Sequence, residues 1–405
     1  MSAPPQRLSG GPLRSGLHFV LLFGVVSLFA DLTYEGARSV TGPFLGTLGA
    51  SGLVVGAVAG FGEFLGYSLR LVSGRWADRS RLYWPITLVG YIMQMLAVPL
   101  LAVAGSWPFA ALLIVFERIG RATRNPPRDI MLAQAGEEMG RGWAFGVNEG
   151  LDQLGALIGP LAIAGILAWR SNFSLAFAAL ALPAFITLAL VFAARLRFPD
   201  AGRIEREATP AEFAGYPRAY WLYCVSAGLV AFGFADFSLI AYRLNQAHVV
   251  AAAWIPIFYA LAMGAGGLAS LAVGRLFDRF GLMVLLPVTA IVAVYAPLAF
   301  LGGFSLALIG VLLWGVGLAA HESVMQAAVA HMVAQERLGS AYGVFGAAFG
   351  LAWFVGSAAL GAAYDWSVTA AAVLAVVSQL LAIPPLLMAV RSFGSPSAAE
   401  TGARS

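Results

Sequence analysis

The sequence GRWADR at residues 74–79 recurs as GRLFDR at residues 274–279, 200 positions further along the chain. A second pair agrees with it, because FGV at residues 145–147 is matched by YGV at residues 342–344, 197 positions apart. Self-similarity at nearly the same spacing is typical of a chain built from two related halves. The alternative is chance recurrence in a chain rich in arginine and glycine.

Outside these motifs the chain consists mostly of long apolar runs. Hydrophobic residues make up 60% of the sequence and charged residues only 11%, so most of the surface must face lipid. Within a bilayer a helix satisfies its own backbone polar groups. We therefore predict an all-α membrane protein with two pseudo-symmetric six-helix bundles, related by an axis along the membrane normal. The twelve predicted spans are residues 17–38, 50–73, 83–104, 107–124, 142–168, 172–195, 218–243, 251–274, 282–302, 304–330, 339–363 and 367–390.

The basic residues give the predicted orientation. All 24 are arginine, which excludes a Walker A lysine for ATP phosphates and a Schiff-base lysine. With both termini inside, nineteen arginines fall in inner segments, and two, Arg170 and Arg243, fall in outer loops. This bias predicts a multi-pass protein of the cell inner (plasma) membrane with both termini in the cytoplasm. Because the charge is distributed rather than gathered in one patch, it indicates no nucleic-acid partner.

Polar segments set the predicted domain boundaries. The apolar run that starts at Leu17 is long for a signal peptide and has no typical cleavage site, so we interpret it as a retained first helix. The longest hydrophilic stretch lies midway along the chain and is interpreted as a linker. The predicted domains are an N-terminal cytoplasmic tail (1–16), an N-terminal bundle (17–195), a cytoplasmic linker (196–217), a C-terminal bundle (218–390) and a C-terminal cytoplasmic tail (391–405).

The repeated loop motif resembles that of the major facilitator superfamily, and the resemblance covers essentially the whole chain. Its residues are Gly74, Asp78, Arg79 and Arg81 in the first copy and Gly274, Asp278 and Arg279 in the second. The first copy departs from the family pattern at Leu82, near which a later glycine is expected. The resemblance implies a secondary transporter that works by alternating access. The aspartates can accept hydrogen bonds from a neighbouring helix N-terminus, which favours a conformational latch over a substrate site.

The fifth predicted span carries a second pattern. Its residues Gly146, Gly155, Gly159 and Pro160 resemble the glycine-proline motif of the family's proton antiporters, although Ile163 and Ala164 replace the closing glycine pair. This resemblance implies export. The alternative is a generic packing face, since glycines at small-xxx-small spacing let helices approach closely.

Ionisable residues inside the predicted spans are the candidate functional residues, because such groups are costly in lipid and usually line a cavity or pair with one another. The first-half candidates are Asp31, Glu35, Arg38, Glu63, Tyr67, Glu117, Arg118, Glu149 and Asp152, and the second-half candidates are Asp236, His321 and Glu322. This asymmetry predicts that the first half couples to an ion, most simply the proton. The second half would supply an apolar wall with Trp314, Phe349 and Trp353.

Arg118 is the predicted cation beside the proton-carrying acid. Arg118-Ile119-Gly120 resembles the arginine-glycine motif that family members use in proton coupling. The expected partner is Glu63, Glu149 or Asp152. The alternative is that these charges are structural ion pairs that lock helices together. His321 has no second metal ligand at helical spacing, so no metal site is predicted.

The leading hypothesis is proton-coupled export of a small organic or cationic solute, with the protein acting as a monomer in the lipid bilayer and without a cofactor. Divalent-metal efflux through the same carboxylates and proton-coupled uptake are the transport alternatives. A transport-inactive sensor or a polytopic enzyme is the alternative from another class. The enzyme hypothesis is disfavoured, since the sequence has no nucleotide-binding loop and no HExxH motif.

Overall fold

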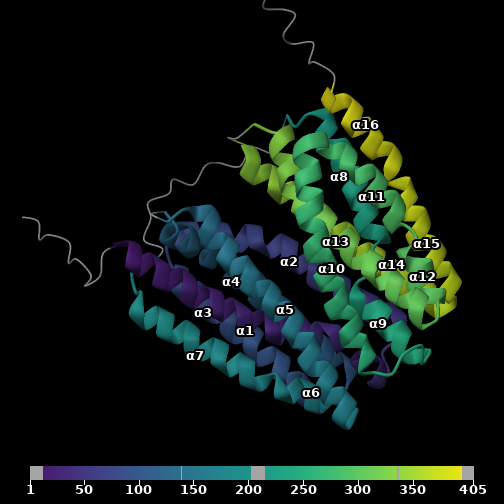
Figure 1. Cartoon of the computed structure of the whole chain (residues 1–405), viewed down its shortest axis with the longest axis horizontal. Helices are drawn as coiled ribbons and strands as arrows, with labels where there is room; N and C mark the ends of the chain where they lie inside the picture. The colour runs from purple at the N-terminus through teal and green to yellow at the C-terminus, as the bar shows by residue number, and fades with distance from the viewer. Residues whose placement is uncertain (1–11, 138, 202–214, 335–336, 395–405) are drawn as a thin grey trace, which may run out of the picture. The chain divides into compact units, whose positions relative to one another are not determined.

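The computed structural model describes residues 12–137, 139–201, 215–334 and 337–394. In those ranges the chain forms helices joined by short turns, and no strand is present (Figure 1). Each of the twelve predicted spans coincides with one helix or with a broken series of helices. Ten described stretches are long and apolar enough to cross a membrane; one of them merges two predicted spans, and the helix of the predicted fourth span is not among the ten. The predicted all-α membrane fold is confirmed.

The helices of the first six predicted spans differ from the prediction mainly at their ends. Their bounds are α1 (Pro12–Thr47), α2 (Gly52–Ser80), α3 (Tyr83–Leu100) followed by η1 (Leu101–Val103), α4 (Trp107–Ala135), α5 (Arg141–Arg170), α6 (Phe173–Ala179) and α7 (Ala181–Arg197). The sixth span is thus formed by α6 and α7, which Leu180 separates.

The second six spans are more often interrupted. Their bounds are α8 (Arg218–Gly233), α9 (Phe237–Gln246), α10 (Trp254–Phe280), η2 (Gly281–Val284), α11 (Leu285–Val292), α12 (Tyr295–Leu301), α13 (Phe304–Met332), α14 (Leu338–Trp366), α15 (Val368–Leu381) and α16 (Ile383–Gly394). The predicted seventh, ninth and twelfth spans are each broken into shorter helices.

Contacts between residues group the chain into two compact units. Unit 1 comprises residues 1–37 and 69–208, and unit 2 comprises residues 38–68 and 209–405. The end of α1 and most of α2 therefore pack with the later helices. The predicted halves, 17–195 and 218–390, remain a prediction, and much of the predicted tails and linker lies outside the described residues.

At the break between α8 and α9, two aromatic side chains of unit 2 form hydrogen bonds with the backbone. The Tyr295 hydroxyl donates to the Gly233 carbonyl at 2.9 Å and accepts from the Ala235 N–H at 2.7 Å. The Trp314 indole N–H donates to the Ala235 carbonyl at 2.8 Å. A break within a span frees backbone groups that lipid cannot satisfy, and these two side chains replace the lost helical hydrogen bonds.

We expect Trp314→Phe to reduce the free energy of unfolding by about 1–3 kcal/mol, because it leaves the buried Ala235 carbonyl unpaired. Trp353→Phe is the matched control: this tryptophan is equally buried, but its Nε1 has no hydrogen-bond partner among the described residues. Denaturant titration of both variants in detergent measures the difference. Equal losses of stability would show that the hydrogen bond contributes nothing beyond ring volume.

Helix α4 corrects the predicted fourth span, which ended at residue 124. The helix continues through Pro126 and Pro127 to Ala135. A proline inside a helix leaves the carbonyl four residues earlier without its usual donor. For Pro126 that carbonyl belongs to Ala122, and the Ser73 hydroxyl of α2 donates to it at 2.9 Å. Pro126 is therefore compatible with a continuous helix.

Candidate functional site

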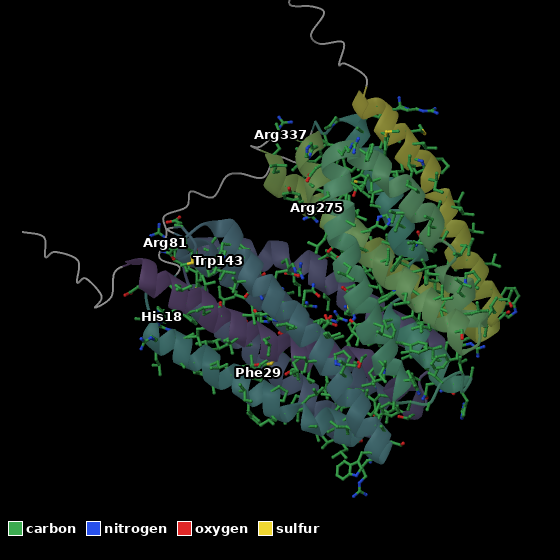
Figure 2. All side chains as sticks on the ribbon, in the orientation of Figure 1. His18, Phe29, Arg81, Trp143, Arg275 and Arg337 are labelled. Carbon is green, nitrogen blue, oxygen red and sulfur yellow. The ribbon has the colours of Figure 1, made fainter. Side chains whose placement is uncertain are left out.

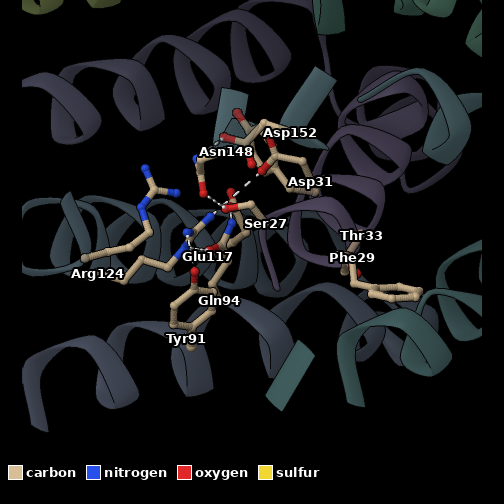
Figure 3. Close-up of polar contacts among 12 residues, drawn as sticks. Ser27, Phe29, Asp31, Thr33, Tyr91, Gln94, Glu117, Arg124, Asn148 and Asp152 are labelled. Atoms are coloured by element: carbon tan, nitrogen blue, oxygen red, sulfur yellow. Dashed lines mark hydrogen bonds and ion pairs between the residues drawn. The ribbon is translucent and has the colours of Figure 1, made fainter. Parts of the chain in front are cut away.

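A cluster of buried charges lies within unit 1, where α1, α3, α4 and α5 contribute polar side chains (Figure 3). Asp31 of α1 and Glu117 of α4 are only 7% and 6% exposed. The charges that act on Asp31 include those of Asp152, Arg121 and Arg124. Both acids are predicted site residues, and both lie inside the unit rather than on its surface.

Arg124 faces Asp31 and is held from the opposite side by α3. Its Nε donates to Gln94 Oε1 at 2.5 Å, and its Nη1 donates to the Tyr91 hydroxyl at 2.9 Å. Its Nη2 lies 3.9 Å from Asp31 Oδ1, at the outer limit of an ion pair. Gln94 also donates from Nε2 to Glu117 Oε1 at 3.0 Å. Gln94 thus links the second buried acid to the arginine that faces the first.

Arg118 of α4 contacts one residue of α1 and one residue of its own helix. Its guanidinium donates to the Tyr34 hydroxyl, and its Nε lies 3.4 Å from Glu117 Oε2. The Arg121 guanidinium stacks over the Tyr34 ring, 4.0 Å from the ring centroid. The partners predicted for Arg118 contact other residues: Asp152 contacts Asn148, Glu149 contacts Gln153, and Glu63 contacts Arg38.

The two acids of α5 have different environments. Asn148 accepts from the Ser27 hydroxyl at 2.9 Å and lies 3.5 Å from Asp152 Oδ2. Asp152 Oδ1 is buried and has no hydrogen-bond partner among the described residues. Glu149 is exposed and accepts from Gln153 Nε2 at 2.9 Å. Although Glu149 and Asp152 are one turn apart, only Asp152 belongs to the buried cluster.

Three arginines of this region were not predicted as site residues, because they were counted among the arginines of the inner segments. Arg121, Arg124 and Arg128 lie within α4, and the side chains of Arg124 and Arg128 are only 1% and 11% exposed. A signal was available: with Glu117 they follow the spacing i, i+4, i+7 and i+11, which places all four on one helical face. The end predicted for the span at residue 124 concealed that pattern.

A second cluster of charges lies within unit 2. Arg38 Nη2 lies 3.0 Å from Glu63 Oε1 and 2.9 Å from Asp236 Oδ2. Asp236 is fully buried, and its other oxygen caps α9 by accepting from the Ser238 N–H at 2.8 Å. The structure brings together three predicted site residues as one ion-pair cluster at the break before α9. It also supplies the partner of Glu63.

The remaining predicted residues of unit 2 lie beside an aromatic cluster. The Tyr67 hydroxyl donates to Glu322 Oε1 at 3.3 Å, and the Tyr67 ring lies 5.3 Å from that of Phe349. Phe349 in turn contacts Trp353 at 5.6 Å between ring centroids. A small cavity of about 10 Å³ is lined by Glu322, Phe349 and Trp353, among others. His321 is buried and lies 3.3 Å from the Thr289 hydroxyl.

The glycines of α5 have two different surroundings. A Cβ at Gly155 would lie 2.9 Å from the Leu32 nitrogen, and one at Gly159 would lie 3.0 Å from the Gly36 nitrogen. These two glycines therefore let α5 contact the backbone of α1 directly. Gly146 has open space around it. Pro160 follows within the same helix.

The loop motifs are only partly described. The side chains of Asp78 and Arg79, and the surroundings of Gly74, lie outside the described residues, whereas Arg81 is exposed just beyond the end of α2 (Figure 2). In the second copy, Asp278 is exposed, and Gly274 has open space around it. The Arg279 guanidinium lies 5.2 Å from the Phe280 ring centroid.

Among the described residues, no group of three or more His, Cys, Asp or Glu side chains is placed to hold a metal ion. Glu35, another predicted site residue, is buried on α1 and acts electrostatically on Asp31 and Arg121.

Long apolar helices with buried ion pairs define a multi-pass membrane protein with polar machinery inside its spans. The chain belongs to the Major Facilitator Superfamily, whose family model matches residues 23–357. It is 42% identical over 390 residues to an uncharacterized protein of Mycobacterium tuberculosis, with 94% of each chain covered.

Solved structures agree on the fold. The chain resembles a bacterial homolog of the human lysosomal transporter Spinster, with a TM-score of 0.73, 16% identity, and coverage of 96% of this chain and 100% of the other. It also resembles the peptide transporter POT in complex with sulfate, with a TM-score of 0.75, 16% identity, and coverage of 96% and 97%. The protein is a secondary transporter of small-molecule substrates and not an enzyme.

Proposed function

We propose that the protein exports a small organic cation in exchange for protons. The observation that carries this proposal is that the buried Asp31 lies 3.9 Å from Arg124 and close to the half-buried Asp152 (Figure 3), one oxygen of which has no hydrogen-bond partner among the described residues. Two acids in a low-dielectric interior do not both carry charge easily. One proton shared by this pair is therefore the simplest coupling unit.

Arg124 is suited to this role because its position does not depend on Asp31. Its hydrogen bonds to Gln94 and Tyr91 fix the guanidinium from α3. When Asp31 gains a proton, the arginine keeps these bonds and its charge remains available to another anion. A cation that stays in place while the neighbouring acid changes charge is what reversible proton binding requires.

Export is favoured by the resemblance of α5 to the antiporter motif. Gly155 and Gly159 let α5 pack closely on α1, and the same two helices carry Asp152 and Asp31. Any shift of α5 along α1 would change the surroundings of both acids, so the motif and the proposed proton site would be coupled.

The proposed substrate class follows from the aromatic cluster of unit 2. The Tyr67 ring packs against Phe349, which contacts the buried Trp353, and the exposed Glu322 places a negative charge beside this cluster. Aromatic faces and a carboxylate together suit an organic cation. We place the protein in the inner membrane as a monomer with both termini in the cytoplasm, in line with its arginine distribution.

The two acids of α5 provide a matched test. Asp152→Asn should reduce pH-gradient-driven export of tetraphenylphosphonium from proteoliposomes at least about tenfold, equivalent to 1.4 kcal/mol. Glu149→Gln, one turn away and exposed, should retain most of the activity. A pH-sensitive dye should report proton movement that depends on the added cation. Unchanged pH dependence in Asp152→Asn would exclude this acid from coupling, and proton movement with Zn²⁺ alone would favour metal efflux.

A further inference from the structure

Asp365, at the end of α14, caps the start of α2. Its Oδ1 accepts from the Gly52 N–H at 2.7 Å, and its Oδ2 accepts from the Leu53 N–H at 2.8 Å. The first N–H groups of a helix have no partner within the helix and carry partial positive charge. A carboxylate that binds two of them makes a strong, charge-assisted contact.

Small residues and aromatic rings make the rest of the contact between the two helices, since the Phe354 ring lies 5.4 Å from that of Phe61 and 6.4 Å from that of Phe64. A Cβ at Gly52 would lie 3.0 Å from the Gly361 carbonyl, and one at Gly60 would lie 2.7 Å from Ser357 Cβ. Further along, a Cβ at Gly350 would lie 3.2 Å from Phe64 Cα. Residue numbers rise in α2 as they fall in α14, so the helices are antiparallel and in close contact.

The seam between α2 and α14 joins the two predicted halves of the transporter, because α2 belongs to residues 17–195 and α14 to residues 218–390. Alternating access requires the halves to separate first at one end of the spans and then at the other. Contacts at the start of α2 must therefore break once in each cycle. The bidentate cap of Asp365 is a strong polar contact of this seam.

We propose that Asp365 is a conformational latch, which holds the transporter closed at the end where α2 begins and releases α2 when that end opens. The inference rests on alternating access and not on the proton or the substrate. The latch consists of hydrogen bonds between a carboxylate at the end of α14 and N–H groups at the start of α2. Because these bonds depend on short distances and on alignment, they break as soon as the two helix ends move apart.

The test measures access to the seam. In a Cys224→Ser background, Ser357→Cys places a thiol at a position that is 1% exposed, and a membrane-impermeant maleimide in detergent reports its exposure. Adding Asp365→Asn should raise the alkylation rate about tenfold, the population change that 1.4 kcal/mol produces. Asp365→Glu should restore a slow rate in part, because it keeps the carboxylate.

Asp129→Asn is the matched control, since it removes an aspartate charge of unit 1 with a side chain that is 44% exposed, whereas the seam lies in unit 2, and it should leave the rate unchanged. Thermal unfolding separates opening from loss of structure: the Asp365→Asn protein should keep a cooperative transition. If its thiol reacts no faster than in the parent, the latch is overturned. If the thiol reacts faster only when cooperative unfolding is lost, Asp365 is structural and the proposal also fails. Neither readout depends on proton coupling.

Discussion

Asp31→Asn should abolish proton-driven transport while leaving the protein folded. The substitution keeps the size of the side chain but removes the charge that faces Arg124 at 3.9 Å. Arg124 retains its bonds to Gln94 and Tyr91, so no buried charge is left without polar contacts. We expect pH-gradient-driven export of tetraphenylphosphonium to fall at least about 100-fold, which corresponds to 2.7 kcal/mol at 1.36 kcal/mol per tenfold. The residual transport should no longer vary with pH.

The control for this variant is Asp129→Asn. Like Asp31, Asp129 lies in unit 1, but it is on α4, pairs with Arg128 at 2.8 Å and has a side chain that is 44% exposed. The Asp129 carboxylate is partly exposed, so solvent screens the loss of its charge, and transport should remain near the parent level. Thermal unfolding in detergent should give similar midpoints for both variants. Proton-driven transport by Asp31→Asn at the parent rate would contradict the assignment of the coupling site.

Arg38→Met should cause a large loss of stability. Arg38 pairs with both Glu63 and the fully buried Asp236, so its removal leaves two acids without their cation. Removing one partner of a buried pair typically costs about 3–5 kcal/mol. Denaturant titration in detergent measures the change. Arg170→Met provides the control, because Arg170 stacks on the exposed Trp169 at 4.8 Å and should matter little.

The pH dependence of the Arg38→Met protein gives a second readout. At neutral pH the unfolded chain carries both acids ionised, whereas the folded variant is favoured when they bind protons. The folded state then binds more protons than the unfolded state, so stability should rise as the pH falls. Adding Asp236→Asn should recover part of the stability at neutral pH. A loss of stability that does not depend on pH would indicate lost packing rather than uncompensated charge.

Several candidate residues could be predicted because a charged side chain inside a span is conspicuous. Asp31, Glu117 and Asp236 were recognised from their position in apolar runs, and all three are buried. Their partners could not be predicted in the same way. Gln94 and Tyr91, which hold Arg124, are ordinary residues in sequence, and only the close contact of α3 with α4 gives them a role. That contact depends on Gly90 and Gly120, where a Cβ would lie 2.7 Å from the facing backbone.

The sequence by itself determined the class of fold, because lipid requires each span to satisfy its own backbone and this produces long apolar runs. It also placed acids and arginines inside those runs. Tertiary structure decided where helices break and which charges meet. Tyr295 and Trp314 form hydrogen bonds with the backbone groups freed at the break before α9. Arg38 of α1 pairs with acids of α2 and of the start of α9. The reason is physical: hydropathy is a local property, whereas the cost of a buried polar group is met by partners from distant helices.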